Sequence, residues 1–166
     1  MNGVSPHMTS MTLTPRLDPY KASPEAYKPL LGLQSYVDRC GLEHSLLELV
    51  KTRASQINGC AYCIEMHTRE AREAGESEAR LYLLNAWRES PLYSARERAA
   101  LEWTEAVTLL AVDHVPDEAW DAARAEFSDK ELVDLTIAIG MINTWNRMAV
   151  SFRLLHPVAG EARKTA

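Results

Sequence analysis

Two cysteines and a histidine are the residues whose types and spacing most clearly indicate chemistry. Cys60 and Cys63 form a C-x-x-C pair, and His67 follows four residues after the second cysteine, in INGCAYCIEMHTREA. At about 100° per residue on a helix, these three positions fall on one face. Asn58-Gly59 favours a chain reversal, so we expect a helix to begin near Cys60. Both thiols and the imidazole would then share one side of that helix.

Dithiol redox catalysis uses residues spaced in this way. A thiol attacks a peroxide or a disulfide only as the thiolate, and a helix N-terminus or a nearby imidazole lowers its pKa from about 8.5. Because His67 lies one turn from Cys63, we expect Cys63 to attack first and form a sulfenic acid, which Cys60 converts to a disulfide. The reverse order stays open, since Cys60 is nearer the helix end.

Two other interpretations of the cysteines compete with redox chemistry. Cys60, Cys63 and His67 with a further donor such as Glu48 would make four zinc ligands, but the first three crowd one side of the ion. No second C-x-x-C or H-x-x-x-H completes such a set, so we expect neither a metal nor another cofactor. The two thiols could instead be small buried hydrophobes, as we expect for the isolated Cys40.

Composition excludes several classes of function. The 166 residues are 46% hydrophobic and 25% charged, which fits one globular domain. A net charge of −5 with scattered lysines and arginines argues against nucleic acid and anionic lipid as partners. No apolar run reaches the roughly 18 residues of a membrane span, and the first residues lack a signal-peptide core. We expect a cytoplasmic protein, in which any disulfide is transient.

The elements that must position these residues are helices. We expect an irregular N-terminal arm over residues 1–20, a helical domain over 21–155 and a C-terminal tail over 156–166. Ser77, Ser94 and Ser128 are expected N-caps, and Gly41 and Gly75 are expected helix ends. Helical periodicity predicts an all-α bundle of about six or seven helices, in segments 23–40, 43–58, 60–75, 77–90, 94–112, 116–127 and 128–152.

The stretch ELVKTRASQINGCAYCIEMH resembles the alkylhydroperoxidase D (AhpD) branch of the carboxymuconolactone decarboxylase family. Glu48 stands twelve residues before Cys60, and the similarity extends more loosely to about Arg153. The resemblance implies an AhpD-like helical fold, homo-oligomers built from trimers (trimer or hexamer), and thiol-dependent peroxidase activity. It further implies that Glu48 is a distal base, His67 a relay, and the two cysteines the reactive dithiol.

The sequence departs from that family pattern at one position. The well-known peroxidase members carry a histidine between the two cysteines, where this chain has Tyr62. The decarboxylase members lack the C-x-x-C pair, which argues against lactone decarboxylation here.

Periodicity and resemblance disagree about Glu48. The apolar stripe of its helix is formed by Leu46, Val50, Ala54 and Ile57, and Glu48 lies nearly opposite, which predicts a solvated glutamate. A catalytic Glu48 would therefore need cover from another helix or from a neighbouring subunit. We expect a homo-oligomer partly for this reason.

The sequence therefore favours a peroxidase that reduces a hydroperoxide and is itself reduced by a dithiol or protein reductant. A redox-sensing binding or scaffold protein without turnover is one alternative. A lyase or isomerase that acts on a small carbon acid through Glu48 and His67 is another. The four tryptophans are expected to pack in the core or between subunits. The polar residues of NTWNR, Asn143, Asn146 and Arg147, are expected to form a structural polar network.

Overall fold

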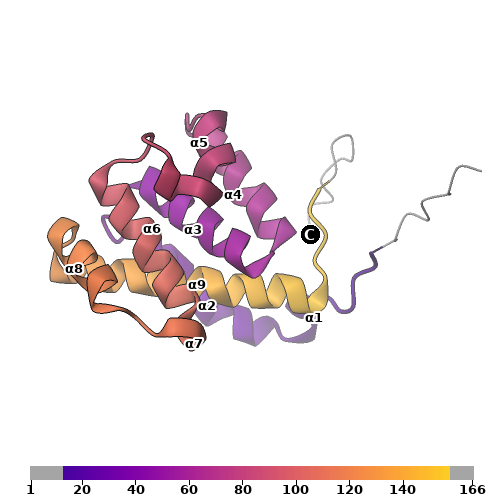
Figure 1. Ribbon diagram of the computed structural model, residues 1–166. Helices are drawn as coiled ribbons and strands as arrows, with labels where there is room; N and C mark the ends of the chain where they lie inside the picture. The colour runs from indigo at the N-terminus through magenta and orange to yellow at the C-terminus, as the bar shows by residue number, and fades with distance from the viewer. Residues whose placement is uncertain (1–12, 158–166) are drawn as a thin grey trace, which may run out of the picture.

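The computed structural model describes residues 13–157, so residues 1–12 of the expected arm and 158–166 of the expected tail lie outside it. Within residues 13–157 the fold is all-α, as predicted, and contains no strand (Figure 1). The elements in chain order are α1 Pro19–Ala22, α2 Pro24–Val37, α3 His44–Asn58, α4 Ala61–Glu73, α5 Glu78–Leu83, the 3₁₀ helix η1 Leu84–Glu89, α6 Ala95–Thr108, α7 Leu110–Asp113, α8 Asp117–Glu126 and α9 Asp129–Phe152.

Local sequence signals fix most of the helix ends. Ser77, Ser94 and Ser128 are N-caps whose side chains accept a hydrogen bond from a backbone N–H three residues later. The latter two form complete capping boxes, which satisfy two otherwise unpaired N–H groups at each helix start. Gly41 and Gly75 have φ of 105° and 99°, which favours glycine at a helix end. The predictions for the three serines and Gly75 are confirmed. α2 already ends at Val37 with Asp38 as its C-cap, so Gly41 lies in the loop that follows and not at the helix end.

Two of the predicted helices are broken. The segment 77–90 becomes α5 followed by η1, with non-helical backbone at Ala86. Leu81, Leu84 and Trp87 are buried and spaced three residues apart, which suits the three residues per turn of a 3₁₀ helix. The segment 94–112 is interrupted at Leu109, where α6 ends before the short α7. Tertiary packing therefore overrides the helical periodicity at these places.

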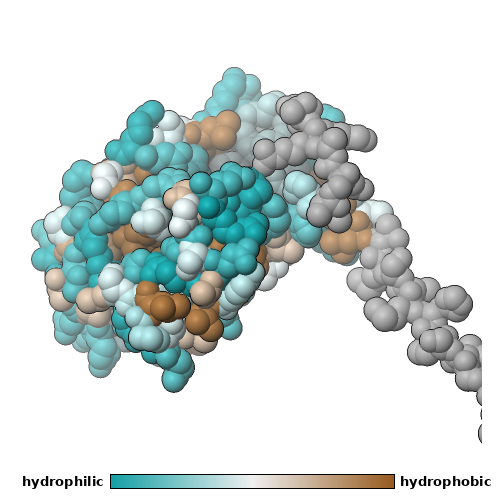
Figure 2. Space-filling view, turned by 90° about the horizontal axis from the view of Figure 1, so that it is seen from above, coloured by the Kyte–Doolittle hydropathy of each residue, from teal (hydrophilic) through white to brown (hydrophobic). Residues whose placement is uncertain are grey.

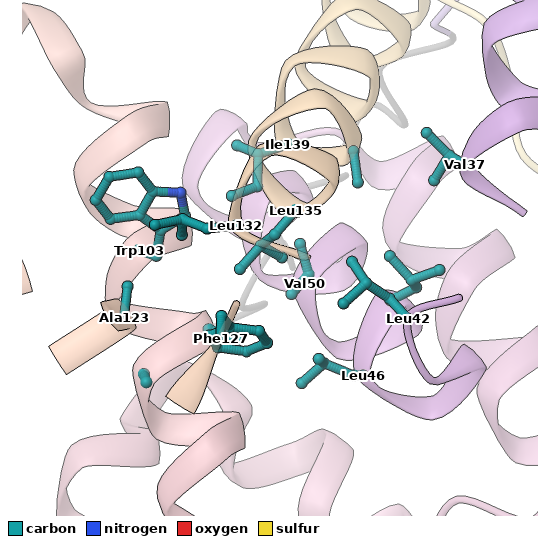
Figure 3. Close-up of a cluster of buried hydrophobic side chains, with 14 of the residues drawn as sticks. Val37, Leu42, Leu46, Val50, Trp103, Ala123, Phe127, Leu132, Leu135 and Ile139 are labelled. Carbon is teal, nitrogen blue, oxygen red and sulfur yellow. The ribbon is translucent and has the colours of Figure 1, made fainter. Parts of the chain in front are cut away.

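The core is built around α3 and α9. α3 packs against α4, α6 and α9, so both of its sides are covered. Figure 3 shows the largest apolar cluster, where Val50 of α3 meets Leu135 and Ile139 of α9, with Trp103 of α6 and Phe127 beside them. α9 runs along the length of the bundle and supports most of the other helices (Figure 1). This central place of α3 decides the environment of Glu48.

The surface of the described part carries no sign of a membrane span. None of the helices within residues 13–157 combines the length and apolar character needed to cross a bilayer. Figure 2 shows one face covered mostly by hydrophilic residues, with hydrophobic residues in separate spots. This is the expected exterior of an amphipathic helical bundle.

Gly59 positions the first cysteine, and substitution of this glycine tests how much its backbone conformation contributes to stability. It adopts the left-handed conformation (φ 66°, ψ 32°) between α3 and α4, and a Cβ there would meet no atom within 4 Å. Gly59→Ala should therefore lower the free energy of unfolding by about 1–2 kcal/mol through backbone strain alone. Gly140→Ala, inside α9 and equally uncrowded, should raise it by roughly 0.5–1 kcal/mol. Denaturant unfolding under reducing conditions checks both, and shifts of equal sign would contradict this account.

Candidate active site

The dithiol sits where α3 turns into α4. Cys60 is the N-cap of α4, and its sulfur accepts a hydrogen bond from the backbone N–H of Cys63 at 3.3 Å. The predicted helix start near Cys60 is thus confirmed. Both cysteines are unpaired thiols and are buried, with exposed fractions of 1% and 2%. The two sulfurs therefore face the protein interior at the positive end of a helix dipole.

The two thiols have opposite pKa shifts. The hydrogen bond from the Cys63 side chain, helped by backbone N–H groups of Cys63 and Tyr62, lowers the pKa of Cys60 to about 7 against the opposing effect of burial. The same hydrogen bond, burial and the charge of Cys60 raise the pKa of Cys63. The pair thus holds one proton on Cys63 and one negative charge on Cys60. These directions favour Cys60 as the first thiolate, the reverse of the order that the position of His67 suggested.

A network of amides and a hydroxyl lies against the sulfurs. Asn146 of α9 donates to Ser55 Oγ at 3.0 Å, and Asn58 donates to the side-chain oxygens of Asn146 and Asn143 at 2.8 and 2.9 Å. Hydrogen bonds from Asn146 lower the pKa of both thiols, and Ser55 does so for Cys63. The polar network expected from NTWNR is therefore present, and it also forms part of the thiol environment.

The second pair at the site is Glu48 and His67. His67 Nδ1 lies 2.9 Å from Glu48 Oε2, and Lys51 Nζ donates to Glu48 Oε1 at 3.1 Å. Glu48 is only 2% exposed, so the solvated glutamate predicted from periodicity is wrong. The cover comes from α4 of the same chain, and burial of Glu48 does not require a neighbouring subunit.

The electrostatics make Glu48 an anion that orients its neighbour. Burial raises the pKa of the Glu48 carboxyl, but the hydrogen bond and charge of His67, joined by Lys51, outweigh burial and leave the pKa below its usual value. An ionised carboxylate only accepts hydrogen bonds, so His67 Nδ1 is the donor in this contact. Whenever the imidazole is neutral, the other ring nitrogen, Nε2, is therefore the acceptor.

The Glu48–His67 pair and the Cys60–Cys63 pair lie near each other, but they are not linked into one continuous hydrogen-bonded chain. His67 follows Cys63 by one turn of α4, and both are buried. Within residues 13–157, however, no hydrogen bond joins His67 to either sulfur, so the direct reach expected from the spacing is not observed. A proton that passes between the pairs needs a bridging water or a side-chain movement.

Lys51 is the residue of this site that the sequence interpretation missed. It is buried, and it pairs with Glu48 and, at 3.9 Å, with Asp38. A signal was available in the spacing of four polar residues, which form a second stripe on α3: Glu48, Lys51, Thr52 and Ser55. A polar stripe on a helix that is central in the bundle must find its partners inside the protein.

Apolar and aromatic side chains cover the dithiol. Cys60 and Cys63 belong to a buried cluster with Ile142 and Ala149, against which Tyr62, Trp145 and Leu154 pack. Tyr62, at the position where the family peroxidases carry a histidine, therefore contributes to this cover. A reactant reaches the sulfurs only when part of the cover moves aside.

The pKa of Cys60 makes thiol reactivity dependent on pH near neutrality. In a Cys40→Ser chain, the alkylation rate of Cys60 by a small reagent should rise through a midpoint near pH 7 and fall away below it, because only the thiolate reacts. Cys63 should stay slow over the same range, since its pKa is raised. Peptide mapping of the label against pH separates the two cysteines. Equal rates at both, or a midpoint near that of an ordinary thiol, would contradict the shared-proton pair.

Comparison with known proteins shows that this all-α fold is AhpD-like. Residues 24–106 match the model of the carboxymuconolactone decarboxylase family, and the chain belongs to that family. The uncharacterised protein YdfG of Bacillus subtilis is 40% identical over 139 residues, which cover 84% of this chain and 95% of YdfG.

Solved structures agree with this assignment. The protein ATU0492 of Agrobacterium tumefaciens, described as of unknown function and proposed as the antioxidant defence protein AhpD, is 52% identical with a TM-score of 0.85. The match covers 87% of this chain and 99% of ATU0492. A peroxidase-related protein of Ralstonia eutropha with an alkylhydroperoxidase AhpD core has a TM-score of 0.73 at 18% identity, over 83% of this chain and 74% of that one. The second likeness concerns the fold alone.

Proposed function

We propose that this protein is a thiol-dependent peroxidase that cycles Cys60 and Cys63 between dithiol and disulfide. The observation that carries the proposal is the hydrogen-bonded thiol pair at the start of α4, in which the pKa of Cys60 is lowered to about 7. A thiolate at neutral pH with a second thiol one turn away is what peroxide reduction requires. The family assignment and the AhpD proposal for ATU0492 support the same activity.

The reaction has three balanced steps. The Cys60 thiolate attacks the terminal oxygen of a hydroperoxide, the O–O bond breaks, and the alkoxide leaves with a proton as the alcohol. Cys63 then gives up its proton and attacks the Cys60 sulfenic acid, so that a disulfide forms and hydroxide leaves as water. A dithiol reductant finally supplies two electrons and two protons and restores both thiols.

In this mechanism Glu48 and His67 move the protons. Glu48 holds the imidazole through Nδ1, and Nε2 accepts the proton that Cys63 must lose, through a bridging water. The same proton then serves the leaving oxygen. The arrangement follows the logic of a carboxylate that orients a histidine base.

Peroxide consumption with and without a reductant tests the proposal. With excess dithiothreitol we expect continuous turnover of an alkyl hydroperoxide, and without it one equivalent of oxidation per chain and a Cys60–Cys63 disulfide. One stoichiometric oxidation with no steady-state consumption of peroxide in the presence of the reductant would instead indicate the redox-sensing protein. A lyase or isomerase activity on a carbon acid that survives Cys60→Ser and Cys63→Ser would overturn the peroxidase.

We also propose that the protein assembles as a homo-oligomer of threefold character. Large apolar side chains are exposed on α7, α8 and α9, among them Val112, Trp120 and Val133. Apolar surface of this kind in a soluble fold is typical of an interface. Light scattering measures the mass directly, and a monomer at micromolar concentration would refute the assembly.

A further inference from the structure

One side of His67 faces two carboxylates. Glu48 Oε2 on α3 lies 2.9 Å from His67 Nδ1, and Glu70 Oε2, one turn along α4, lies 3.8 Å from the same nitrogen. The three donor atoms all lie within 4.8 Å of one another. His67 Nδ1 has a single proton to donate, and Glu48 is near enough to accept it. Glu70 lies beyond hydrogen-bond distance and receives no hydrogen bond from this nitrogen.

We propose that Glu48, His67 and Glu70 bind a divalent transition-metal ion, with Zn²⁺ as the best-suited probe, and that the bound ion switches off the dithiol chemistry. Neither sulfur belongs to this donor set, which separates it from the Cys₂His zinc arrangement considered from the sequence. The switching part of the proposal rests on the proposed peroxidase function. The binding part does not.

The geometry fits a metal of this class. Ligand atoms about 2.0–2.1 Å from a tetrahedral zinc lie about 3.3 Å apart, and the two measured separations, 2.9 and 3.8 Å, bracket that value. One imidazole and two carboxylates suit zinc, iron or manganese, with the remaining positions open to water. Glu48 and His67 are buried, and Glu70 is 41% exposed, so the ion would enter from the Glu70 side.

The charges around the three ligands also favour a cation. Lys51 donates a hydrogen bond to Glu48 Oε1, and Arg69 lies 3.5 Å from Glu70 Oε1, whereas the Oε2 atom of each carboxylate lies against His67 Nδ1. Each of these two cations is shared with further acids: Lys51 with Asp38, and Arg69 with Glu65 and Glu73. The acids outnumber the cations, and the local field is negative.

The switch follows from the tautomer of one ring. In the metal-free site, a neutral His67 that donates from Nδ1 to the Glu48 carboxylate has Nε2 as its acceptor, as the proposed relay needs. A metal at Nδ1 requires the lone pair of that nitrogen, so the ring proton moves to Nε2 and none is lost. His67 then presents a donor where an acceptor is needed and cannot take the proton of Cys63.

Zn²⁺ binding is measured first, without the thiols. In a Cys40→Ser, Cys60→Ser, Cys63→Ser chain, competition with a chromogenic chelator should give one Zn²⁺ per chain. Glu70→Gln should weaken binding about 10-fold or more, and His67→Ala should abolish it. Glu73→Gln, a matched change on the same helix, should leave it unchanged. Wild-type chain with its thiols methylthiolated provides a second sample should the triple variant lose its helical circular dichroism.

Inhibition is measured second, in the intact chain. Zn²⁺ should inhibit peroxide turnover, and Glu70→Gln should need about 10-fold more Zn²⁺ for the same fractional inhibition, with each chain's rate expressed relative to its own metal-free rate. Equal inhibition of both chains would place the effect at the sulfurs and overturn the switch. Absence of Zn²⁺ binding in both thiol-free samples, or binding that Glu70→Gln does not weaken, would overturn the site. A chain that binds Zn²⁺ but shows no turnover would count against the peroxidase alone.

Discussion

Without reductant, Cys63→Ser should undergo a single oxidation by an alkyl hydroperoxide and leave Cys60 trapped as a sulfenic acid, because no second thiol of the chain closes the disulfide. With excess dithiothreitol its turnover should be slower than that of the wild-type chain, because the reductant must itself attack the buried sulfenic acid. Mass spectrometry should find one added oxygen on the peptide that contains Cys60, at up to one equivalent per chain. Cys63→Ala, which has no side-chain donor, should in addition raise the pKa of Cys60, so its single oxidation should be slower at pH 7 than in the wild-type chain.

Cys60→Ser completes the test of which cysteine attacks the hydroperoxide first. We expect turnover to be lost and Cys63 to be oxidised more slowly than Cys60 is in Cys63→Ser, because burial still raises the pKa of the Cys63 thiol when the Cys60 thiolate is gone. Cys40→Ser is the matched control, and it should retain full activity because Cys40 belongs to a different cluster from the dithiol. Rapid oxidation of Cys63 in Cys60→Ser would reverse the assigned order and leave the dithiol mechanism intact.

Glu48→Gln should lower kcat for peroxide reduction by about 100-fold or more, a typical effect of losing acid–base assistance. It should also destabilise the fold by about 3–5 kcal/mol, because the buried Lys51 ammonium would lose its anionic partner. Steady-state kinetics and denaturant unfolding of the same preparation measure the two effects. Asp38 is too exposed to replace Glu48 as that partner.

The double variant Glu48→Gln, Lys51→Met separates these two effects. It removes both buried charges together, and such replacements are often neutral for stability. We therefore expect stability to return to near the wild-type value while kcat stays low. Activity that recovers together with stability would show that Glu48 contributes only to folding, and it would remove Glu48 from the proposed relay.

The helix ends could be predicted from the sequence because their causes are local. A serine side chain that caps the N–H three residues later, or a glycine at positive φ, acts within one turn, and Ser94, Ser128 and Gly75 all did so. The break after α5 could not be predicted in this way. Periodicity over 77–90 is compatible with one helix, and only packing of Leu84 and Trp87 into the core selects the tighter turn.

The same distinction between local causes and tertiary packing applies to the candidate site. The shared face of Cys60, Cys63 and His67 follows from spacing on one helix. The burial of Glu48 depends on which helix covers α3, and its own amphipathic pattern gave the wrong answer. The pKa values of both thiols depend partly on Asn146, which lies far along the chain and joins the site only through the packing of α9.

The two ends of the described chain meet beside the dithiol. After α9 the backbone turns through Arg153 at φ 54°, and Leu154 is held by a hydrogen bond to Ala149 and packs over the thiol cluster. At the other end, Arg16 donates its N–H to the Phe152 carbonyl at 3.0 Å. The described backbone therefore enters and leaves the fold next to the reactive sulfurs. A ligand that binds to either of these two segments would lie beside the disulfide and could change the access of a reductant to it.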